Sequence, residues 1–346
     1  MNVRLICGVG VALVGGCASA PVVETASVQA AVERTLLVNG TPLHIRINEP
    51  NIPDAVLAGL VRAIATQATS VDNTFFATGS LELINAKLKS SRGPIELSKT
   101  TGTMIAAALR GYQLTEGIFD PTVGPLVRAW VAAKGKEPAP SLIGERLKLV
   151  GADKWRLSSD RSQLSTTVVG MRLEPGGLRD GWVVAKVIEL MRSRRLINFY
   201  INFRGALYYG SGVGPGGEPW QVTVRDQNSR PVGQVALDGQ SLSISYSLVP
   251  RPDGKPGRKG HIIDPRSGFL VSDQRSVVAL AGNPLDAEIL STALVVLGDR
   301  GRSAVARFDN AGVLVFQGTK NVPIQLGKTV SYAPLASRIG DDYFND

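Results

Sequence analysis

Two stretches of the chain alternate apolar and polar residues with the period of two that is typical of β-strands. Between Leu36 and Ile47 (L-L-V-N-G-T-P-L-H-I-R-I) the alternation predicts a hairpin or a bulged strand. His44 lies within it among apolar neighbours, so we expect a structural strand residue rather than a ligand. From Phe199 to Ile244 a longer stretch predicts a series of antiparallel strands.

Other stretches repeat their apolar residues at the three-to-four-residue spacing of helices. The helices predicted in this way cover Asp54 to Phe75, Ser98 to Tyr112, Leu126 to Lys134 and Trp182 to Arg194. Gly135 closes the third of them, and a proline-rich turn follows near Glu137 to Pro140. Helices and strands in this order predict an α+β fold, with mixed, largely antiparallel sheets and packed helices.

The composition is that of a soluble globular protein, with 44% hydrophobic and 19% charged residues among 346. A chain of this length forms two domains or one large domain. The only cysteines, Cys7 and Cys17, lie close to the N-terminus, so the folded part contains no thiol. This excludes disulfides, zinc-thiolate sites and cysteine nucleophiles.

The N-terminus has the pattern of an export signal. Arg4 precedes an apolar stretch that ends at Gly16 and is too short to span a bilayer. Within it V-G-G-C (Val14 to Cys17) resembles the lipobox of bacterial lipoproteins, in which the cysteine is acylated. The alternative cleavage site, A-S-A, is followed by Pro21, which ordinary signal peptidase tolerates poorly. We therefore expect a lipoprotein signal peptide over residues 1–16, lipidation at Cys17, a flexible tether over residues 17–34, and one domain over residues 35–346 on the periplasmic side of the cell envelope.

The net charge of +9 at pH 7 suits nucleic acid, an anionic membrane surface or a phosphorylated ligand. Export and the scatter of the charges argue against nucleic acid. One basic loop, R-P-D-G-K-P-G-R-K-G (Arg251 to Gly260), leads directly to His261, one of 2 histidines in the chain. A match to G-x-G-x-x-G at Gly212 to Gly217 is followed by a strand-like segment, so it predicts a hairpin loop and not a dinucleotide site.

Four segments combine residue types that occur in phosphate and metal sites. They are G-I-F-D-P-T-V-G-P-L (residues 117–126), L-E-P-G-G-L-R-D-G-W (173–182), H-I-I-D-P-R-S-G (261–268) and A-E-I-L-S-T-A-L-V-V-L-G (287–298). The first predicts an Asx-type turn at Asp120 and a helix start that can hold a phosphate, or simply a well-capped helix. The second is either a close backbone approach to a ligand or a glycine-rich bend. The fourth puts Glu288 and Thr292 on one helix face, where both oxygens could bind one Mg²⁺, or where the acid only complements the helix dipole.

Taken together and in order, these segments resemble the FAD:protein FMN transferase family, the ApbE flavin transferases, from about Thr35 to Gly298. The family pattern is approximately G-x-F-D-P-T-V-G-P-L, D-L-G-G-x-A-K-G-Y, H-I-x-D-P-x-T-G and A-D-A-x-x-T-A-L-x-V-L-G. The resemblance implies an ApbE-like fold and an enzyme that uses Mg²⁺ to cleave the pyrophosphate of FAD. It also implies that FMN is attached to a threonine of an acceptor flavoprotein and that AMP is released.

The resemblance also assigns residues to the site. It places catalysis at His261 and Asp264, with His261 positioning a phosphate or assisting a proton transfer. Residues expected to contact FAD are Leu81 and Asn85 of the flavin loop G-S-L-E-L-I-N (79–85), Asp120, Thr122, Glu174, Asp180 and Ile263. The metal positions fall on Gly177, Glu288 and Thr292, and we expect neither Glu288 nor Thr292 in the core. The implied partners are FAD, the acceptor protein and, through the lipid anchor, the membrane.

Several positions depart from the family pattern. Asp180 stands where A-K-G has its lysine, Glu288 is one methylene longer than the metal-binding aspartate, and Ile244-Ser245-Tyr246 replaces T-S-G. Arg204 replaces a glycine, where it would either crowd the flavin or contact a phosphate. Two hypotheses follow. One is an active transferase, which the retained acids, Thr122, Thr292 and His261 favour. The other is a catalytically impaired envelope lipoprotein that binds FAD or another nucleotide, or an FAD pyrophosphate hydrolase.

Overall fold

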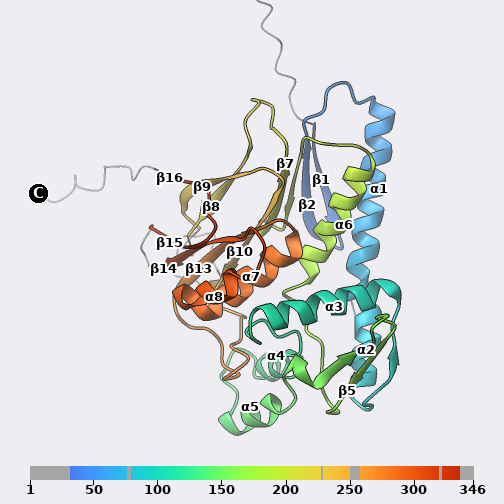
Figure 1. Ribbon diagram of the computed structural model, residues 1–346, viewed down its shortest axis with the longest axis vertical. Coiled ribbons are helices and arrows are strands. Elements are labelled where there is room, and N and C mark those ends of the chain that lie inside the picture. The colour runs from blue at the N-terminus through green and yellow to red at the C-terminus, as the bar shows by residue number, and fades with distance from the viewer. Residues whose placement is uncertain (1–31, 76–78, 227–228, 250–257, 319–321, 336–346) are drawn as a thin grey trace, which may run out of the picture.

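A computed structural model of the protein describes residues 32–75, 79–226, 229–249, 258–318 and 322–335 (Figure 1). The expected signal peptide, the lipidation site Cys17 and nearly all of the tether lie outside these residues. Most of the basic loop before His261 lies outside them as well. Within the described ranges, no helix has both the length and the apolar character needed to cross a membrane.

The largest element is an eight-stranded sheet in which all neighbouring strands are antiparallel. In spatial order its strands are β1 (Val32–Val38), β2 (Thr41–Ile47), β6 (Phe199–Phe203), β7 (Leu207–Ser211), β10 (Gln240–Tyr246), β13 (Arg275–Ala281), β14 (Gly312–Gln317) and β15 (Ile324–Gly327). The predicted N-terminal hairpin is confirmed as β1 and β2. His44 is a strand residue within it, as expected, and its Nδ1 lies 2.8 Å from the hydroxyl of Thr35.

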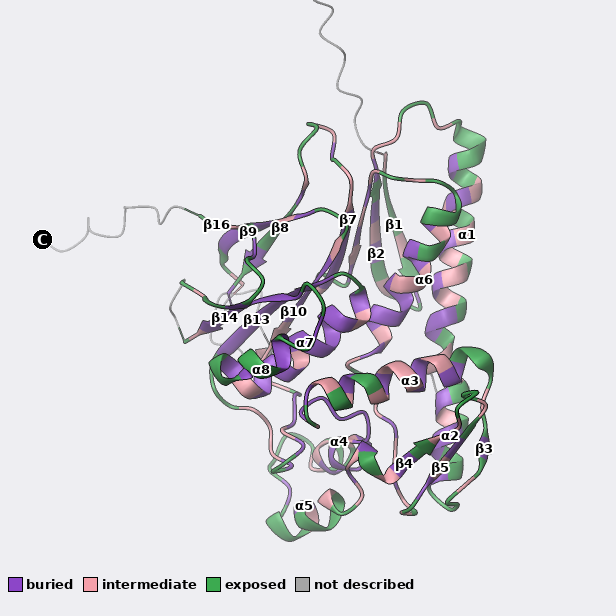
Figure 2. Ribbon diagram, viewed as in Figure 1, coloured by how far each residue is buried: buried purple, intermediate pink, exposed green. Residues whose placement is uncertain are grey.

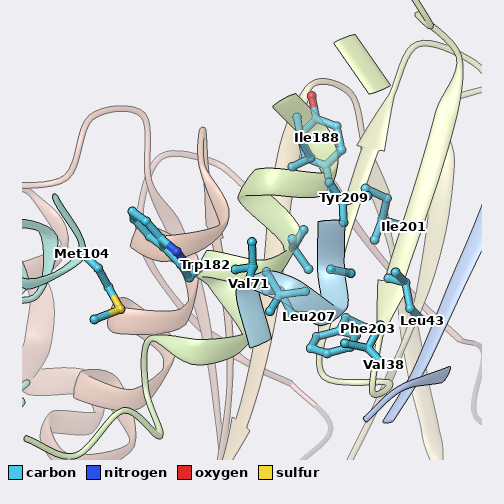
Figure 3. Packing of buried hydrophobic residues seen from close by; sticks show 14 of the residues in the cluster. Val38, Leu43, Val71, Met104, Trp182, Ile188, Ile201, Phe203, Leu207 and Tyr209 are labelled. Carbon is cyan, nitrogen blue, oxygen red and sulfur yellow. The ribbon is translucent and has the colours of Figure 1, made fainter. Parts of the chain in front are cut away.

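Three helices cover one face of this sheet because each has an apolar side that packs on it (Figure 1). They are α1 (Asp54–Asp72), α6 (Arg179–Ser193) and α7 (Pro284–Leu297). Val71 of α1 and Trp182 of α6 belong to the same buried cluster as Phe203 and Leu207 of the strands (Figure 3). Helix α7 is buried along most of its length (Figure 2).

A small sheet covers the opposite face of the main sheet. Its strands are β16 (Tyr332–Pro334), β9 (Pro231–Leu237) and β8 (Trp220–Arg225). Successive residues of β13 show the two-sided burial, since Val277 packs in the cluster of α7 whereas Val278 packs with Trp220 and Val222 of the small sheet. Strand β8 follows the glycine segment 212–217, so the absence of a dinucleotide-binding helix there is confirmed.

Most of the remaining helices gather beside one end of the main sheet, where α1 also ends (Figure 1). This part contains η1 (Asn73–Phe75), α2 (Ser80–Leu88), α3 (Lys99–Leu114), α4 (Gly124–Ala132), α5 (Pro140–Leu147), η2 (Ala152–Lys154) and the three-stranded sheet β3 (Ile95–Glu96), β5 (Gln163–Thr166) and β4 (Trp155–Leu157). Elsewhere lie the short β11 (Leu248–Val249), β12 (Arg258–Lys259), η3 (Gly298–Gly301) and α8 (Arg302–Val305).

The predicted helices are confirmed with shifted bounds. Helix α3 follows Ser98, whose hydroxyl caps it by accepting the N–H of Thr101 at 3.2 Å. Helix α6 begins at Arg179 rather than at Trp182. The segment 79–85 is not a loop, because its residues from Ser80 onward form α2.

Candidate active site

A cavity of about 590 Å³ brings together segments that are far apart in the sequence. Its walls come from the turn before α4, the loop before α6, the β6–β7 turn, the end of β10, residues 261–263 and α7. All four segments with candidate chemistry therefore meet at one place. The polar and charged residues that line it are Asp120, Glu174, Asp180, Arg204, Ser243, Ser245, Tyr246, His261, Glu288 and Thr292.

Asp120 is fixed on the cavity wall by its own turn. Its Oδ1 accepts the backbone N–H of Thr122 at 2.8 Å and the Thr122 hydroxyl at 2.6 Å, which is the predicted Asx-type turn. Thr122 is fully buried, and its hydroxyl also accepts the N–H of Gly151 at 2.7 Å. Burial raises the pKa of Asp120, and the two hydrogen bonds from Thr122 oppose this effect. Thr122 therefore orients Asp120 and does not itself line the cavity.

Glu174 and the glycines after it form the adjacent wall. The Glu174 backbone N–H donates to Pro121 O at 2.7 Å, which ties this segment to the Asp120 turn. Its Oε1 accepts the N–H of Gly176 at 3.1 Å, and burial raises the pKa of Glu174. A Cβ on Gly177 would lie only 2.7 Å from the Phe119 ring, so glycine lets this backbone pack closely on Phe119, and the same position is 3.5 Å from Thr292 Oγ1 of α7.

Asp180 of α6 and Glu288 of α7 are two buried carboxylates on the same cavity wall, 8% and 7% exposed. Glu288 Oε2 accepts the N–H of Gly181 at 2.6 Å. Burial is the main cause that raises the pKa of both groups, and the charge of Asp180 raises the pKa of Glu288 further. Our expectation that Glu288 lies outside the core is wrong. The two helices pack so tightly that a Cβ on Gly181 would lie 2.7 Å from Glu288 Oε2.

The predicted metal positions are brought together here. The Thr292 hydroxyl, the backbone at Gly177 and the carboxylates of Asp180 and Glu288 supply hard oxygen atoms, the ligands that Mg²⁺ prefers. No group of three or more His, Cys, Asp or Glu within the described ranges forms a metal cluster by itself. A cation here would need hydroxyl, backbone and substrate or water oxygens as well. Because two neighbouring buried carboxylates are electrostatically unfavourable alone, these residues fit a bound divalent cation.

Arg204 and His261 supply the remaining ionisable groups of the wall. Arg204 Nη1 lies 3.3 Å from Asp180 Oδ2. Partial desolvation of the imidazole within the cavity is the main cause that lowers the pKa of His261, and the positive charge of Arg204 lowers it further. The lowered pKa favours the neutral imidazole, the form that can accept a proton.

The segment after His261 divides between the cavity and a turn. Ile263 is buried and lines the cavity. Asp264 does not line the cavity. Its carboxylate accepts a hydrogen bond from the Arg266 guanidinium at 2.6 Å, and its backbone carbonyl accepts one from the N–H of Gly268 at 2.8 Å. Burial alone would raise the pKa of Asp264, but hydrogen bonds and charge from Arg266 lower it. The structure thus places Asp264 in a turn and does not bring it together with the other predicted residues.

Leu81 and Asn85 also lie apart from the cavity. Leu81 is a core residue, 1% exposed. The Asn85 amide donates to Leu173 O at 3.1 Å and accepts the Leu173 N–H at 2.7 Å. Because Leu173 precedes Glu174, Asn85 positions the backbone that carries a cavity acid. Neither side chain is placed to contact a ligand in this cavity.

Two serines of the cavity wall were not predicted. The hydroxyls of Ser243 and Ser245 lie 2.9 and 2.8 Å from the hydroxyl of Ser291 on α7. The signal is present in the sequence as S-L-S-I-S-Y (residues 241–246), where the period of two places the serines on one face of β10. That face could be identified only once the sheet had placed α7 against it.

The fold is that of flavin transferases of known structure. The flavin transferase ApbE from Vibrio cholerae superposes with a TM-score of 0.71 at 22% identity, over 87% of this chain and 97% of that chain. The apo form of the Pseudomonas stutzeri flavinyl transferase ApbE superposes with a TM-score of 0.70 at 23% identity, over 86% of this chain and 94% of that one. The predicted α+β fold is thereby confirmed.

The chain belongs to the ApbE family, whose model matches residues 39–315. It is 27% identical over 276 residues to the FAD:protein FMN transferase of Haemophilus influenzae, covering 75% of this chain and 78% of that protein. It is 26% identical over 328 residues to the FAD:protein FMN transferase of Salmonella typhimurium, covering 90% of this chain and 91% of that protein. The family expected from the sequence segments is confirmed.

Proposed function

We propose that this protein is an FAD:protein FMN transferase, which moves FMN from FAD to a threonine of an acceptor flavoprotein and releases AMP. One observation carries the proposal: the four family segments converge on a single cavity that presents three buried carboxylates, an imidazole and the Thr292 hydroxyl. Shifted pKa values in a cavity are typical of functional sites. The names of the sequence relatives agree with this activity.

In the proposed reaction the threonine hydroxyl oxygen bonds to the phosphorus on the FMN side of the FAD pyrophosphate. The bond from that phosphorus to the bridging oxygen breaks, and AMP leaves with the bonding electrons. The hydroxyl proton must be removed as the new bond forms. His261 is suited to accept it, because this ring faces the cavity with a lowered pKa.

The other wall residues bind and position FAD. Asp120 and Glu174 accept hydrogen bonds from its hydroxyl or amino groups, and Ile263 offers an apolar surface to the isoalloxazine ring. Glu288, Thr292, Asp180 and the Gly177 backbone would hold Mg²⁺. When bound, Mg²⁺ supplies positive charge to the pyrophosphate oxygens as charge develops on the leaving AMP.

The products distinguish the proposed activity from its alternatives. The purified full-length protein is incubated with FAD and a threonine-containing acceptor peptide, with and without Mg²⁺, and the mixture is analysed by mass spectrometry. Mg²⁺-dependent AMP together with an FMN adduct on the peptide is the expected result. AMP without an adduct would identify an FAD hydrolase, and bound FAD without either product would identify a binding protein.

We also propose that Cys17 carries a lipid and anchors the domain on the periplasmic side of the envelope. The support is V-G-G-C at the end of a short apolar stretch. Cys17→Ser should move the protein from the membrane fraction to the soluble fraction and remove the acyl mass. Cys7→Ser, which changes the other cysteine, should leave both unchanged. A wild-type chain without acyl mass would contradict this proposal.

A further inference from the structure

The turn between β6 and β7 holds an arginine in a conformation that favours glycine or asparagine. Arg204 and Gly205 have φ values of 62° and 70°, and Ala206 N donates to Phe203 O at 3.2 Å. Two consecutive positive φ values are the signature of a type I′ turn, in which Asn-Gly and Gly-Gly are preferred. Arginine has no local advantage there, since its Cβ meets the steric cost of the left-handed region.

Hydrogen bonds around the turn hold Arg204 in this conformation. Its backbone N–H donates to Pro42 O at 3.1 Å. The N–H of Gly205 donates to Asn202 Oδ1 at 2.9 Å, and the Tyr208 hydroxyl donates to Gly205 O at 2.7 Å. The neighbouring strands therefore fix the strained residue, and backbone strain held in this way is concentrated at functional sites.

The side chain of Arg204 projects into a cavity that otherwise carries negative charge. Among the cavity-lining residues in the described part of the chain, Arg204 is the only arginine or lysine, against Asp120, Glu174, Asp180 and Glu288. Its Nη1 lies 3.3 Å from Asp180 Oδ2, but its side chain is 48% exposed whereas that of Asp180 is 12% exposed. About half of the Arg204 side-chain surface is therefore accessible to a ligand.

We infer that Arg204 binds the pyrophosphate of the substrate, with its free N–H groups donating to phosphate oxygens while Asp180 orients the guanidinium. This inference rests on the proposed use of FAD. A dianionic pyrophosphate enters a wall of carboxylates unfavourably unless cations accompany it. A guanidinium presents several N–H groups in one plane, and this geometry matches phosphate oxygens. Arg204 thus discriminates between flavins, because it strengthens the binding of those that carry phosphate.

The test compares the affinities of FAD, FMN and riboflavin, which share the isoalloxazine ring but differ in phosphate. Arg204→Asn removes the charge, and asparagine suits the positive φ, so the turn should be retained. The expected result is a roughly 10-fold to 100-fold weaker affinity for FAD, a smaller loss for FMN, and no change for riboflavin. Arg204→Lys, which keeps the charge but not the planar donor group, should recover part of the lost FAD affinity.

Arg195→Asn is the matched control. Arg195 also has a positive φ, 61°, and it lies outside the cavity, so this variant repeats the substitution and the charge loss at another left-handed position. It should bind all three flavins as the wild type does. Equal loss of FAD and riboflavin affinity in Arg204→Asn would overturn the inference, because Arg204 would then shape the flavin site. Unchanged FAD affinity would overturn it too.

Inorganic pyrophosphate separates this inference from the proposed function. If the wild type binds pyrophosphate in the presence of Mg²⁺ and Arg204→Asn binds it at least about 10-fold more weakly, Arg204 is a pyrophosphate ligand even if FMN transfer is never observed. If FMN transfer is observed but Arg204→Asn binds both pyrophosphate and FAD as tightly as the wild type, the proposed function survives and the inference fails. A wild type that binds neither FAD nor pyrophosphate would overturn both.

Discussion

Two cavities lie on different sides of α4, and they differ in the sign of their charge. The candidate active site brings four carboxylates to one arginine. The second cavity, of about 630 Å³, is lined by Lys89, Arg128, Arg146 and Arg172, with Glu82 as its one acid among the described residues. Size does not distinguish the two.

The two cavities differ in how far their charges are solvated and paired. The second cavity has exposed cations at Lys89, Arg128 and Arg146, and Glu82 forms a 2.8 Å salt bridge with Arg172 that lowers its pKa. In the first cavity burial raises the pKa of each acid. Solvated or paired charges cost little, whereas buried unbalanced charges are unfavourable. The buried acids of the first cavity are unfavourable for folding, and acids with shifted pKa values cluster at functional sites. We therefore assign the function to the first cavity.

The two histidines give a large expected contrast in activity. His261→Ala should lower the rate of FMN transfer about 100-fold, because it removes the group that accepts the hydroxyl proton. His44→Ala should retain the wild-type rate, since His44 is hydrogen-bonded to Thr35 on the N-terminal hairpin and does not line the cavity. Steady-state rates with saturating FAD measure both. Full activity of His261→Ala would show that this imidazole is only part of the wall.

A pair of glycines tests the tight packing behind Glu288. Gly181→Ala should cost about 1–3 kcal/mol of unfolding free energy, because the new methyl group would lie 2.7 Å from Glu288 Oε2 and 2.9 Å from Pro284 O. Gly144→Ala in α5 meets nothing within 4 Å and should add about 0.5–1 kcal/mol through its helix propensity. Urea unfolding measures both changes. Equal effects at the two positions would contradict the packing that buries this acid.

The buried carboxylates should make stability depend on pH. The folded-state pKa values of Asp180 and Glu288 are raised, so the folded chain holds protons that the unfolded chain has already released. Their contribution to stability is present below the ordinary carboxyl pKa and is lost as the pH rises through the raised values. Glu288→Gln should therefore gain about 1 kcal/mol over the wild type at pH 8, and less at pH 4.

Thermal unfolding at several pH values between 4 and 8 measures the difference in stability between Glu288→Gln and the wild type. Added Mg²⁺ should reduce the gap at pH 8 by stabilising the ionised wild-type site. A constant difference between variant and wild type across the range would show that Glu288 titrates normally in the folded chain.

The basic cavity should have the smallest effect on FMN transfer. Arg128→Gln combined with Arg146→Gln should change the transfer rate by less than about twofold, since these solvated charges do not reach the other cavity. Lys136→Gln combined with Lys148→Gln removes the same charge from exposed positions outside both cavities and serves as the control. A tenfold loss confined to the arginine pair would show that the second cavity takes part in the reaction.

Local patterns in the sequence were sufficient for much of the fold and part of the site. The periods of two and of three to four residues predicted the N-terminal hairpin and the helices. The Asp-Pro-Thr stretch predicted the turn that fixes Asp120, because such turns depend on neighbouring residues only. The helical spacing of Glu288 and Thr292 placed both on one side of α7.

What the sequence could not provide depends on contacts between distant segments. The Glu288 carboxylate is enclosed because Gly181 brings α6 against α7, a contact between segments 107 residues apart. Leu81 and Asn85 lie on a helix whose buried side faces the core and the Leu173 backbone rather than the cavity. Asp264 was assigned from its motif, but Arg266, two residues along, occupies its carboxylate.

The most direct test compares one acid from each cavity in the same assay. The measurement is the rate at which an acceptor protein becomes flavinylated, followed by flavin fluorescence on a denaturing gel, for the wild type, Glu288→Gln and Glu82→Gln. We predict that Glu288→Gln loses activity by about 100-fold or more, because it removes a carboxylate from the cation and pyrophosphate site. Glu82→Gln should stay within about twofold of the wild type. Equal rates for all three proteins would contradict the assignment of flavin transfer to the acidic cavity.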